Sequence, residues 1–265
     1  MLSCAGTAGP SREVAVRMGV NLVDSLSALA AWTQRDQLVA LPSPALVNLG
    51  SSLKVAEGWV NLDGSPIALV AGLPRPVVAA SYRASGVRRQ VSRDRYIGIL
   101  KAHKFVHHRL EHRLPFADNS VDNVFAGEVL EHLCVDVAHR VLRECRRVLG
   151  PGGVVRICVP DLEHAVEQYL ADQKQEALGF FLYDNGRGGL SAHKSMWDYG
   201  LLSDALLAAG FASVQQCASR TGRTPDLDVL DAWLRIPVQV DHRFHGKPIT
   251  DSTASRSAIP EQADH

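Results

Sequence analysis

The sequence lacks any excess of charge, because its 28 Lys and Arg residues balance its 28 Asp and Glu residues. Without a global positive field, a nucleic acid backbone is not an expected partner. Long apolar runs that could span a bilayer are also absent, and the N-terminus has no basic stretch followed by an apolar one. We therefore expect a soluble, cytoplasmic protein without membrane insertion, which could form a homo-oligomer.

Cysteines are few, and no two of them have the CxxC spacing of a redox or zinc motif. Three fall at apolar positions of expected helices or strands, as buried thiols do. We interpret the five as buried thiols in a reducing cytosol: Cys4, Cys134, Cys145, Cys158 and Cys217.

With 265 residues, 46% of them hydrophobic, the chain is large enough for one domain with decorations. We expect an N-terminal helical extension at 1–40 and a main domain at 41–240. Prolines and arginines suggest an insertion of uncertain structure at about 64–107. The polar residues 241–265 suggest a disordered tail.

Apolar patterning predicts strands alternating with helices along the main domain. Such alternation implies an α/β fold with a mostly parallel sheet flanked by helices on both faces. The predicted strands are 45–49, 59–62, 121–126, 154–159 and 211–218, and the predicted helices are 14–29, 136–149, 162–178 and 201–209.

Ligands of open parallel sheets bind beyond the C-terminal strand ends. The first strand ends at Gly50, which is followed by Ser51 and Ser52, and the second ends at Asp63. A glycine lets the backbone approach a ligand closely, and a carboxylate can accept both hydroxyls of a ribose. The missing GxGxxG pattern argues against a dinucleotide.

Three stretches carry a resemblance to a known family: LPFADNSVDNVFAGEVLEHL, VLRECRRVLGPGGVVRICVPDLE and HKSMWDYGLLSDALLAAGFASV. They resemble S-adenosylmethionine-dependent methyltransferases of type 11, in particular a branch associated with polysaccharide synthesis. The resemblance runs from about Leu46 to Leu230 and extends to enzymes that methylate mycobacterial methylmannose polysaccharides. It implies the Rossmann-like fold of class I methyltransferases, with S-adenosylmethionine as cofactor.

The resemblance also implies roles for residues at the strand ends. Asp63 would hold the ribose and Leu114 would touch the adenine. The methionine end would contact Asn48, Gly50 and Ser51, and the sulfonium would lie near Ala126, Gly127 and Glu128. The chain departs from the family at Ser51 and Ser52, where a second glycine and often a cysteine are usual. It also lacks the family's acidic residue at its usual place before the LPF turn, where Glu111 could substitute.

A divalent metal site is predicted from Glu128, Glu131 and His132. Offsets of three and four residues place all three side chains on one face if a helix begins at Glu128. The arrangement resembles that of ubiquinone-pathway O-methyltransferases and of small-RNA terminal 2'-O-methyltransferases, where it binds a metal, and His193 would complete the site. Magnesium or manganese is expected. In metal-free relatives the same residues cap a helix or line the pocket, and His132 or His193 would then be the general base, so both alternatives stay open.

Trp197, Asp198 and Tyr199 follow His193 and suit sugar stacking and hydroxyl binding, although such a segment can equally be a packed lid. The arginine-rich stretch within 64–107 could grip an anionic group or form a solvated face. We expect an O-methyltransferase for a sugar hydroxyl of a saccharide or glycosylated metabolite, with His132, His193 and Glu131 as catalytic residues. The alternatives are a methyltransferase for small molecules or quinones, and a catalytically silent subunit that binds the cofactor.

Overall fold

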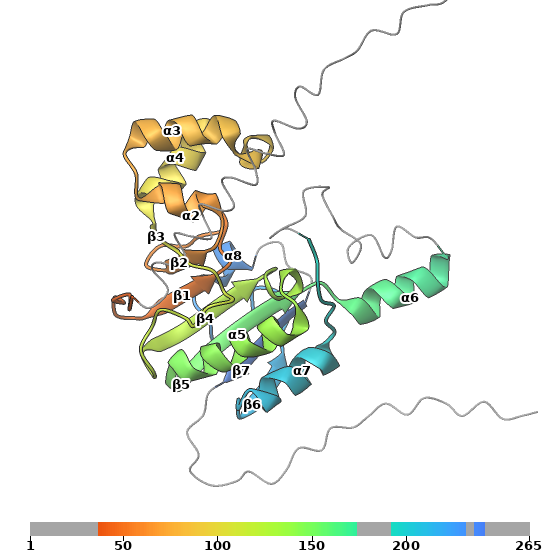
Figure 1. The fold of residues 1–265 in the computed structure, drawn as a ribbon. Helices are drawn as coiled ribbons and strands as arrows, with labels where there is room; N and C mark the ends of the chain where they lie inside the picture. The colour runs from red at the N-terminus through yellow and green to blue at the C-terminus, as the bar shows by residue number, and fades with distance from the viewer. Residues whose placement is uncertain (1–36, 174–191, 232–235, 242–265) are drawn as a thin grey trace, which may run out of the picture.

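The computed structural model describes residues 37–173, 192–231 and 236–241 (Figure 1). The predicted helix at 14–29 and nearly all of the predicted extension and tail lie outside these residues. Among the described residues, no helix is long and apolar enough to cross a membrane.

Seven strands of the described chain form one sheet, in the order β3-β2-β1-β4-β5-β7-β6. The strands from β3 to β5 are parallel, whereas β7 is antiparallel to both β5 and β6. This confirms the predicted α/β, mostly parallel Rossmann-like fold. The strands are β1 (Leu46–Leu49), β2 (Val60–Asp63), β3 (Lys104–His107), β4 (Val121–Gly127), β5 (Leu149–Val159), β6 (Ser213–Gln216) and β7 (Ile236–Asp241).

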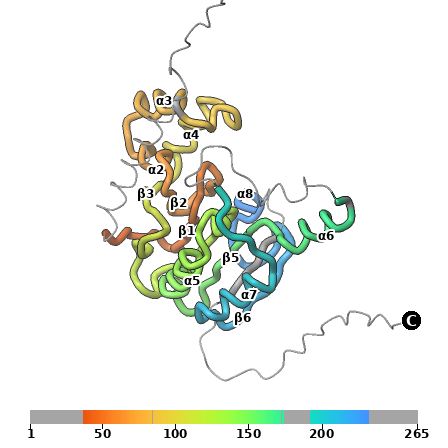
Figure 2. Tube along the Cα trace, turned by 45° about the vertical axis from the view of Figure 1, so that its right-hand side comes forward, coloured from red at the N-terminus to blue at the C-terminus, as the bar shows by residue number. Residues whose placement is uncertain are grey.

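Helices cover the sheet as the apolar patterns predict. The helix α5 buries Ala138, Val141 and Cys145 against one face, and α7 packs beside it (Figures 1 and 2). The helix α6 begins at an Asp161 side chain that accepts a hydrogen bond from the Glu163 amide, an ordinary N-cap. Their bounds are α5 Val135–Val148, α6 Leu162–Asp172 and α7 Tyr199–Ala208.

The range 64–107, expected to be an insertion of uncertain structure, consists of helices and one strand of the main sheet. The prolines begin helices here instead of interrupting them: Pro66 is the first residue of α2, and Pro76 lies in the first turn of α3. A separate core that includes Val78 and Tyr96 joins these helices beyond β3 (Figure 1). The elements before β3 are α2 (Pro66–Ala71), α3 (Arg75–Ala84), the 3₁₀ turn η1 (Gly86–Arg89) and α4 (Arg93–Ala102).

The connection from β1 to β2 contains no helix, although parallel strands are usually joined through one. Residues 50–59 instead fold back closely, and Trp59 is buried and donates from Nε1 to Asp226 at 2.8 Å. The short helix α8 (Leu227–Leu230) packs with Trp59 and Phe125 and covers the face that a crossover helix would occupy.

Candidate active site

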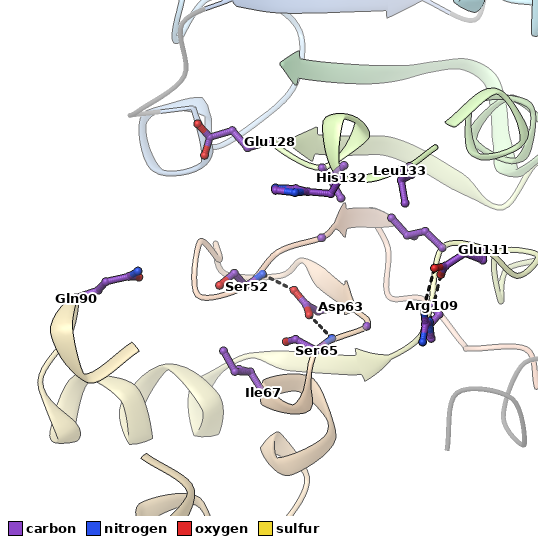
Figure 3. Close-up of a pocket in the computed structure, with 14 residues that line it drawn as sticks. Ser52, Asp63, Ser65, Ile67, Gln90, Arg109, Glu111, Glu128, His132 and Leu133 are labelled. Carbon is purple, nitrogen blue, oxygen red and sulfur yellow. Dashed lines mark hydrogen bonds and ion pairs between the residues drawn. The ribbon is translucent and has the colours of Figure 1, made fainter. Parts of the chain in front are cut away.

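A cavity of about 460 Å³ opens beyond the C-terminal ends of β1, β2 and β4 (Figure 3). This is the place where parallel sheets bind ligands. Figure 3 shows His132 and Leu133 on one side and Asp63 with Ser52 and Ser65 on the other. The lining residues are Gly50, Ser52, Asp63, Gly64, Ser65, Ile67, Gln90, Arg109, Leu110, Glu111, Glu128, Val129, His132 and Leu133.

Gly50 and Asp63 lie together, as predicted. Gly50 has a φ of 61°, and a Cβ on it would come within 2.3 Å of Val129 Cγ2, so only glycine fits this turn. Asp63 is 8% exposed and accepts hydrogen bonds from the Ser52 amide at 2.6 Å and the Ser65 amide at 2.7 Å. A carboxylate offers about four lone-pair sites, so Asp63 can still accept from a ligand.

Glu128 faces Lys54 across the end of the sheet. The Lys54 Nζ and Glu128 Oε2 atoms are 2.6 Å apart, and each side chain is 38% exposed. Glu128 has a φ of 55°, unusual for a residue with a side chain, and its amide donates to the Cys158 carbonyl at 2.9 Å. This left-handed turn directly after β4 brings the carboxylate to the cavity wall.

Three of the four predicted metal ligands meet beside the cavity. Glu131, His132 and His193 have ligand atoms within 4.8 Å of one another. Glu131 is 2% exposed, and its Oε2 has no hydrogen-bond partner among the described residues. Burial raises the pKa of Glu131 to about 8 and lowers that of His132. A neutral imidazole and a buried carboxyl with one free oxygen, Oε2, together form an acceptable cation site in the described chain.

Backbone contacts bring His193 to this cluster from far along the chain. The Glu131 carbonyl accepts from the Lys194 amide at 2.7 Å and from the Ser195 amide at 3.2 Å. The His132 and His193 rings consequently lie 4.8 Å apart, centroid to centroid. His132 Nδ1 lies 3.3 Å from the Ala192 carbonyl, so that Nδ1 carries the proton and Nε2 keeps its lone pair.

Glu128 does not belong to this cluster, and the predicted reason for including it is wrong. No helix begins at Glu128: the 3₁₀ turn η2 spans Leu130–His132, and α5 begins at Val135. The left-handed backbone of Glu128 breaks the helical spacing, and its carboxylate pairs with Lys54 instead.

Several residues predicted to contact the cofactor do not line the cavity. Leu114 is 1% exposed in the main core, and Leu110 lines the cavity in its place. Asn48 is buried and donates to Asn61 Oδ1 at 3.0 Å and to the Lys54 carbonyl at 2.8 Å. It therefore stabilises the loop between β1 and β2. Ser51, Ala126 and Gly127 also lie outside the lining.

The aromatic segment after His193 has structural roles in the described chain. Trp197 is 4% exposed in the core and donates from Nε1 to Ser195 Oγ at 2.9 Å, which holds the segment that carries His193. Asp198 caps α7 by accepting from the Leu201 amide at 2.8 Å, and Tyr199 packs against the core. None of the three predicted sugar-binding residues lines the cavity.

Sequence reasoning missed Lys54, Gln90 and the pair of Arg109 with Glu111. Lys54 lies four residues beyond Gly50 and could have been noticed as a cation in a ligand loop. Gln90 follows η1, in a range whose structure could not be predicted. Glu111 lines the cavity as suggested, but its carboxylate is held by Arg109 at 2.8 Å.

Comparison with known families finds one match. Residues 64–157, about a third of the chain, match the family described as a methyltransferase domain. This match supports a methyltransferase, the activity that the resemblance of the sequence implies. The matched stretch begins after β2, so the part played by Gly50 and Asp63 in this methyltransferase depends on the geometry above.

None of the curated proteins compared matches the chain. Among solved structures, the chain is similar to one from a Haloferax volcanii complex that contains the Trm112 methyltransferase activator. The two are 18% identical with a TM-score of 0.43, and the match covers 88% of this chain and 96% of that one. A methyltransferase of Thermotoga maritima has 15% identity, 88% and 97% coverage, and a TM-score of 0.42. Likenesses this low say nothing of the acceptor or of partners.

Proposed function

We propose that this methyltransferase modifies a hydroxyl of a saccharide or glycosylated metabolite, with a divalent cation bound by Glu131, His132 and His193. The observation that carries the proposal is the buried Glu131 carboxyl beside two imidazoles, whose Oε2 has no hydrogen-bond partner among the described residues. A cation can hold two neighbouring hydroxyls, which sugars offer and simple phenols or amines do not.

The cavity has groups that fit S-adenosylmethionine. Gly50 allows close approach of a ligand to the backbone, and Asp63 has lone pairs for ribose hydroxyls. The amino acid end of the cofactor is a zwitterion. Lys54 and Glu128, which pair with each other at 2.6 Å, could exchange partners to bind its carboxylate and its ammonium.

The donor set also fits a divalent cation. One carboxylate and two imidazoles suit manganese better than magnesium, which prefers oxygen ligands. A bound cation would offset the cost of burying Glu131 as an ion, and it would lower the pKa of a sugar hydroxyl.

Methyl transfer forms a C–O bond as the C–S bond of the sulfonium breaks, and the hydroxyl must lose its proton. Because Nδ1 of His132 donates to the Ala192 carbonyl, its Nε2 can take either a cation or that proton. If no cation binds, His132 and His193 remain as general bases.

Exhaustive chelation separates these two mechanisms. We expect chelator to abolish methyl transfer to a saccharide acceptor and manganese to restore it. Calorimetry should detect one manganese ion in the wild type and none in Glu131→Gln, while both proteins bind S-adenosylhomocysteine equally. Full turnover after chelation would end the metal proposal and leave the histidines as bases.

A further inference from the structure

A basic surface lies on the helical unit beyond β3, which consists of α2, α3, η1 and α4. Residues 64–104 contain eight Lys and Arg residues and a single acidic one, Asp94, although the whole chain is balanced. Five of these cations are exposed around the turn that joins α3 to α4. We call them the arginine rim: Arg83, Arg88, Arg89, Arg93 and Arg95.

The guanidinium groups of the arginine rim make no ion pair or hydrogen bond within the described part of the chain. Arginines elsewhere in that part do: Arg147 pairs with Glu144 at 2.6 Å, and Arg140 with Asp136 at 2.9 Å. Five neighbouring cations without acidic partners repel one another, so a bound anion would relieve that repulsion.

The turn that carries the rim is held in one conformation. Val87 is 9% exposed in the core of the helical unit, and its carbonyl accepts from the Gln90 amide at 2.8 Å. Tyr82 donates its hydroxyl to the Val91 carbonyl at 2.8 Å, and Ser92 caps α4. The flanking arginines therefore project from a preorganised scaffold, which lowers the entropic cost of binding.

This turn also borders the active site. Gln90 lies between Arg89 and Arg93 in the chain, and it lines the same cavity as Asp63 and His132 (Figure 3). A ligand that extends outward past Gln90 would meet the rim next, while its other end remained at the cation cluster.

We propose that the arginine rim binds a phosphate or diphosphate group of the acceptor, so that the saccharide methylated here is a phosphorylated one. This inference rests on the proposed function. The guanidinium fork matches phosphate oxygens, and arginine rather than lysine makes up the whole rim. The balanced charge of the chain, and the position of the rim on the turn whose Gln90 lines the cavity, favour a compact anion over an extended polyanion.

The test compares two variants of equal charge. Arg88→Gln/Arg89→Gln removes two rim cations, whereas Arg75→Gln/Arg143→Gln removes two exposed cations that do not belong to the rim. Calorimetry at physiological salt, with S-adenosylhomocysteine saturating, would measure binding of inorganic pyrophosphate to each full-length protein. We expect at least tenfold weaker pyrophosphate binding in the rim variant and less than a twofold change in the control.

Binding of S-adenosylhomocysteine should be equal in all three proteins, which separates this test from the proposed function. Equal affinity of the wild type and the rim variant for pyrophosphate, or no binding by the wild type, would overturn the proposal. A second arm uses vesicles of phosphatidylglycerol and of phosphatidylcholine. If only the anionic vesicles bound the wild type, with no binding of free pyrophosphate, the rim would be a membrane contact and the proposal wrong.

Discussion

Charged residues around the cavity give the sharpest predictions at the scale of single side chains. We expect Lys54→Met to weaken binding of S-adenosylhomocysteine about tenfold, because one charge-assisted hydrogen bond to the ligand's carboxylate is lost. Binding of 5'-methylthioadenosine, which lacks the amino acid end, should not change. Titration calorimetry with both ligands checks this.

Lys104→Met serves as the matched control for Lys54, because Lys104 is exposed and, among the described residues, its Nζ donates only to the Ala40 carbonyl. If Lys54→Met weakened both ligands equally, the lysine would support the loop and would not contact the methionyl carboxylate.

His108 gives a prediction about pH. Burial, and then the neighbouring His112, lower the pKa of His108 to about 4, and its Nε2 has no hydrogen-bond partner in the described chain. The unfolded chain, with a pKa near 6.5, takes up this proton between pH 6.5 and 4 while the folded chain does not. The free energy of unfolding should therefore fall by about 3 kcal/mol as the pH drops across that window.

In His108→Asn this contribution to acid sensitivity should be missing. Urea unfolding at pH 7 and at pH 4.5 would measure it, because the wild type should lose more stability than the variant between the two. Equal losses would mean that His108 is protonated in the folded protein.

Individual site residues were predictable where they directly follow or end a recognisable strand. Gly50 and Asp63 follow directly from the ends of two recognisable strands. Gln90 lines the cavity and Lys54 pairs with Glu128 at its wall, both from turns without regular structure, and no periodicity indicates where such side chains point. Glu128 was grouped wrongly because a helical spacing was assumed where the backbone is left-handed.

At the scale of elements, the segment at 218–231 is tied to β5 by a buried ion pair. Arg156 and Asp231 are both fully buried and paired, and Arg156 also donates to the Thr221 carbonyl at 2.7 Å. Asp231→Asn would leave the guanidinium buried without its counter-charge. We expect a loss of about 3 to 5 kcal/mol in the free energy of unfolding.

Chemical denaturation of Asp231→Asn and of Asp228→Asn would test this, since Asp228 is exposed and has no side-chain partner among the described residues. The control should change stability by less than about 0.5 kcal/mol. A similar small change in Asp231→Asn would show that the pair does not anchor α8 over the sheet.

Element prediction succeeded for long periodic segments and failed for short or exposed ones. The apolar stripe of α5 and the mainly apolar segments of β1, β4 and β5 identify those elements. The strand β3 has four residues, of which only His107 is buried, so it carries no apolar signal. The prolines of α2 and α3 were interpreted as helix breakers although they occupy first turns, where proline is well tolerated.

At the scale of the whole molecule, a parallel sheet brings residues distant in the chain to one edge. Gly50, Asp63 and His132 lie in three separate segments and line one cavity. The alternation of strands and helices was enough to predict this convergence. The insertion of β7 between β5 and β6, and the packing of α8 beside Trp59, were not predicted, because both depend on contacts between segments distant in the chain.

Calorimetric titration of the full chain with S-adenosylhomocysteine tests the central claim most directly. We predict one binding site in the wild type and an affinity about 5- to 150-fold lower in Asp63→Ala, the cost of about 1 to 3 kcal/mol for losing a charge-assisted hydrogen bond. Asp63→Ala should be compared at a temperature where its thermal unfolding has not begun. No binding by the wild type, or equal affinity in a folded Asp63→Ala, would contradict a cofactor site at the ends of β1 and β2.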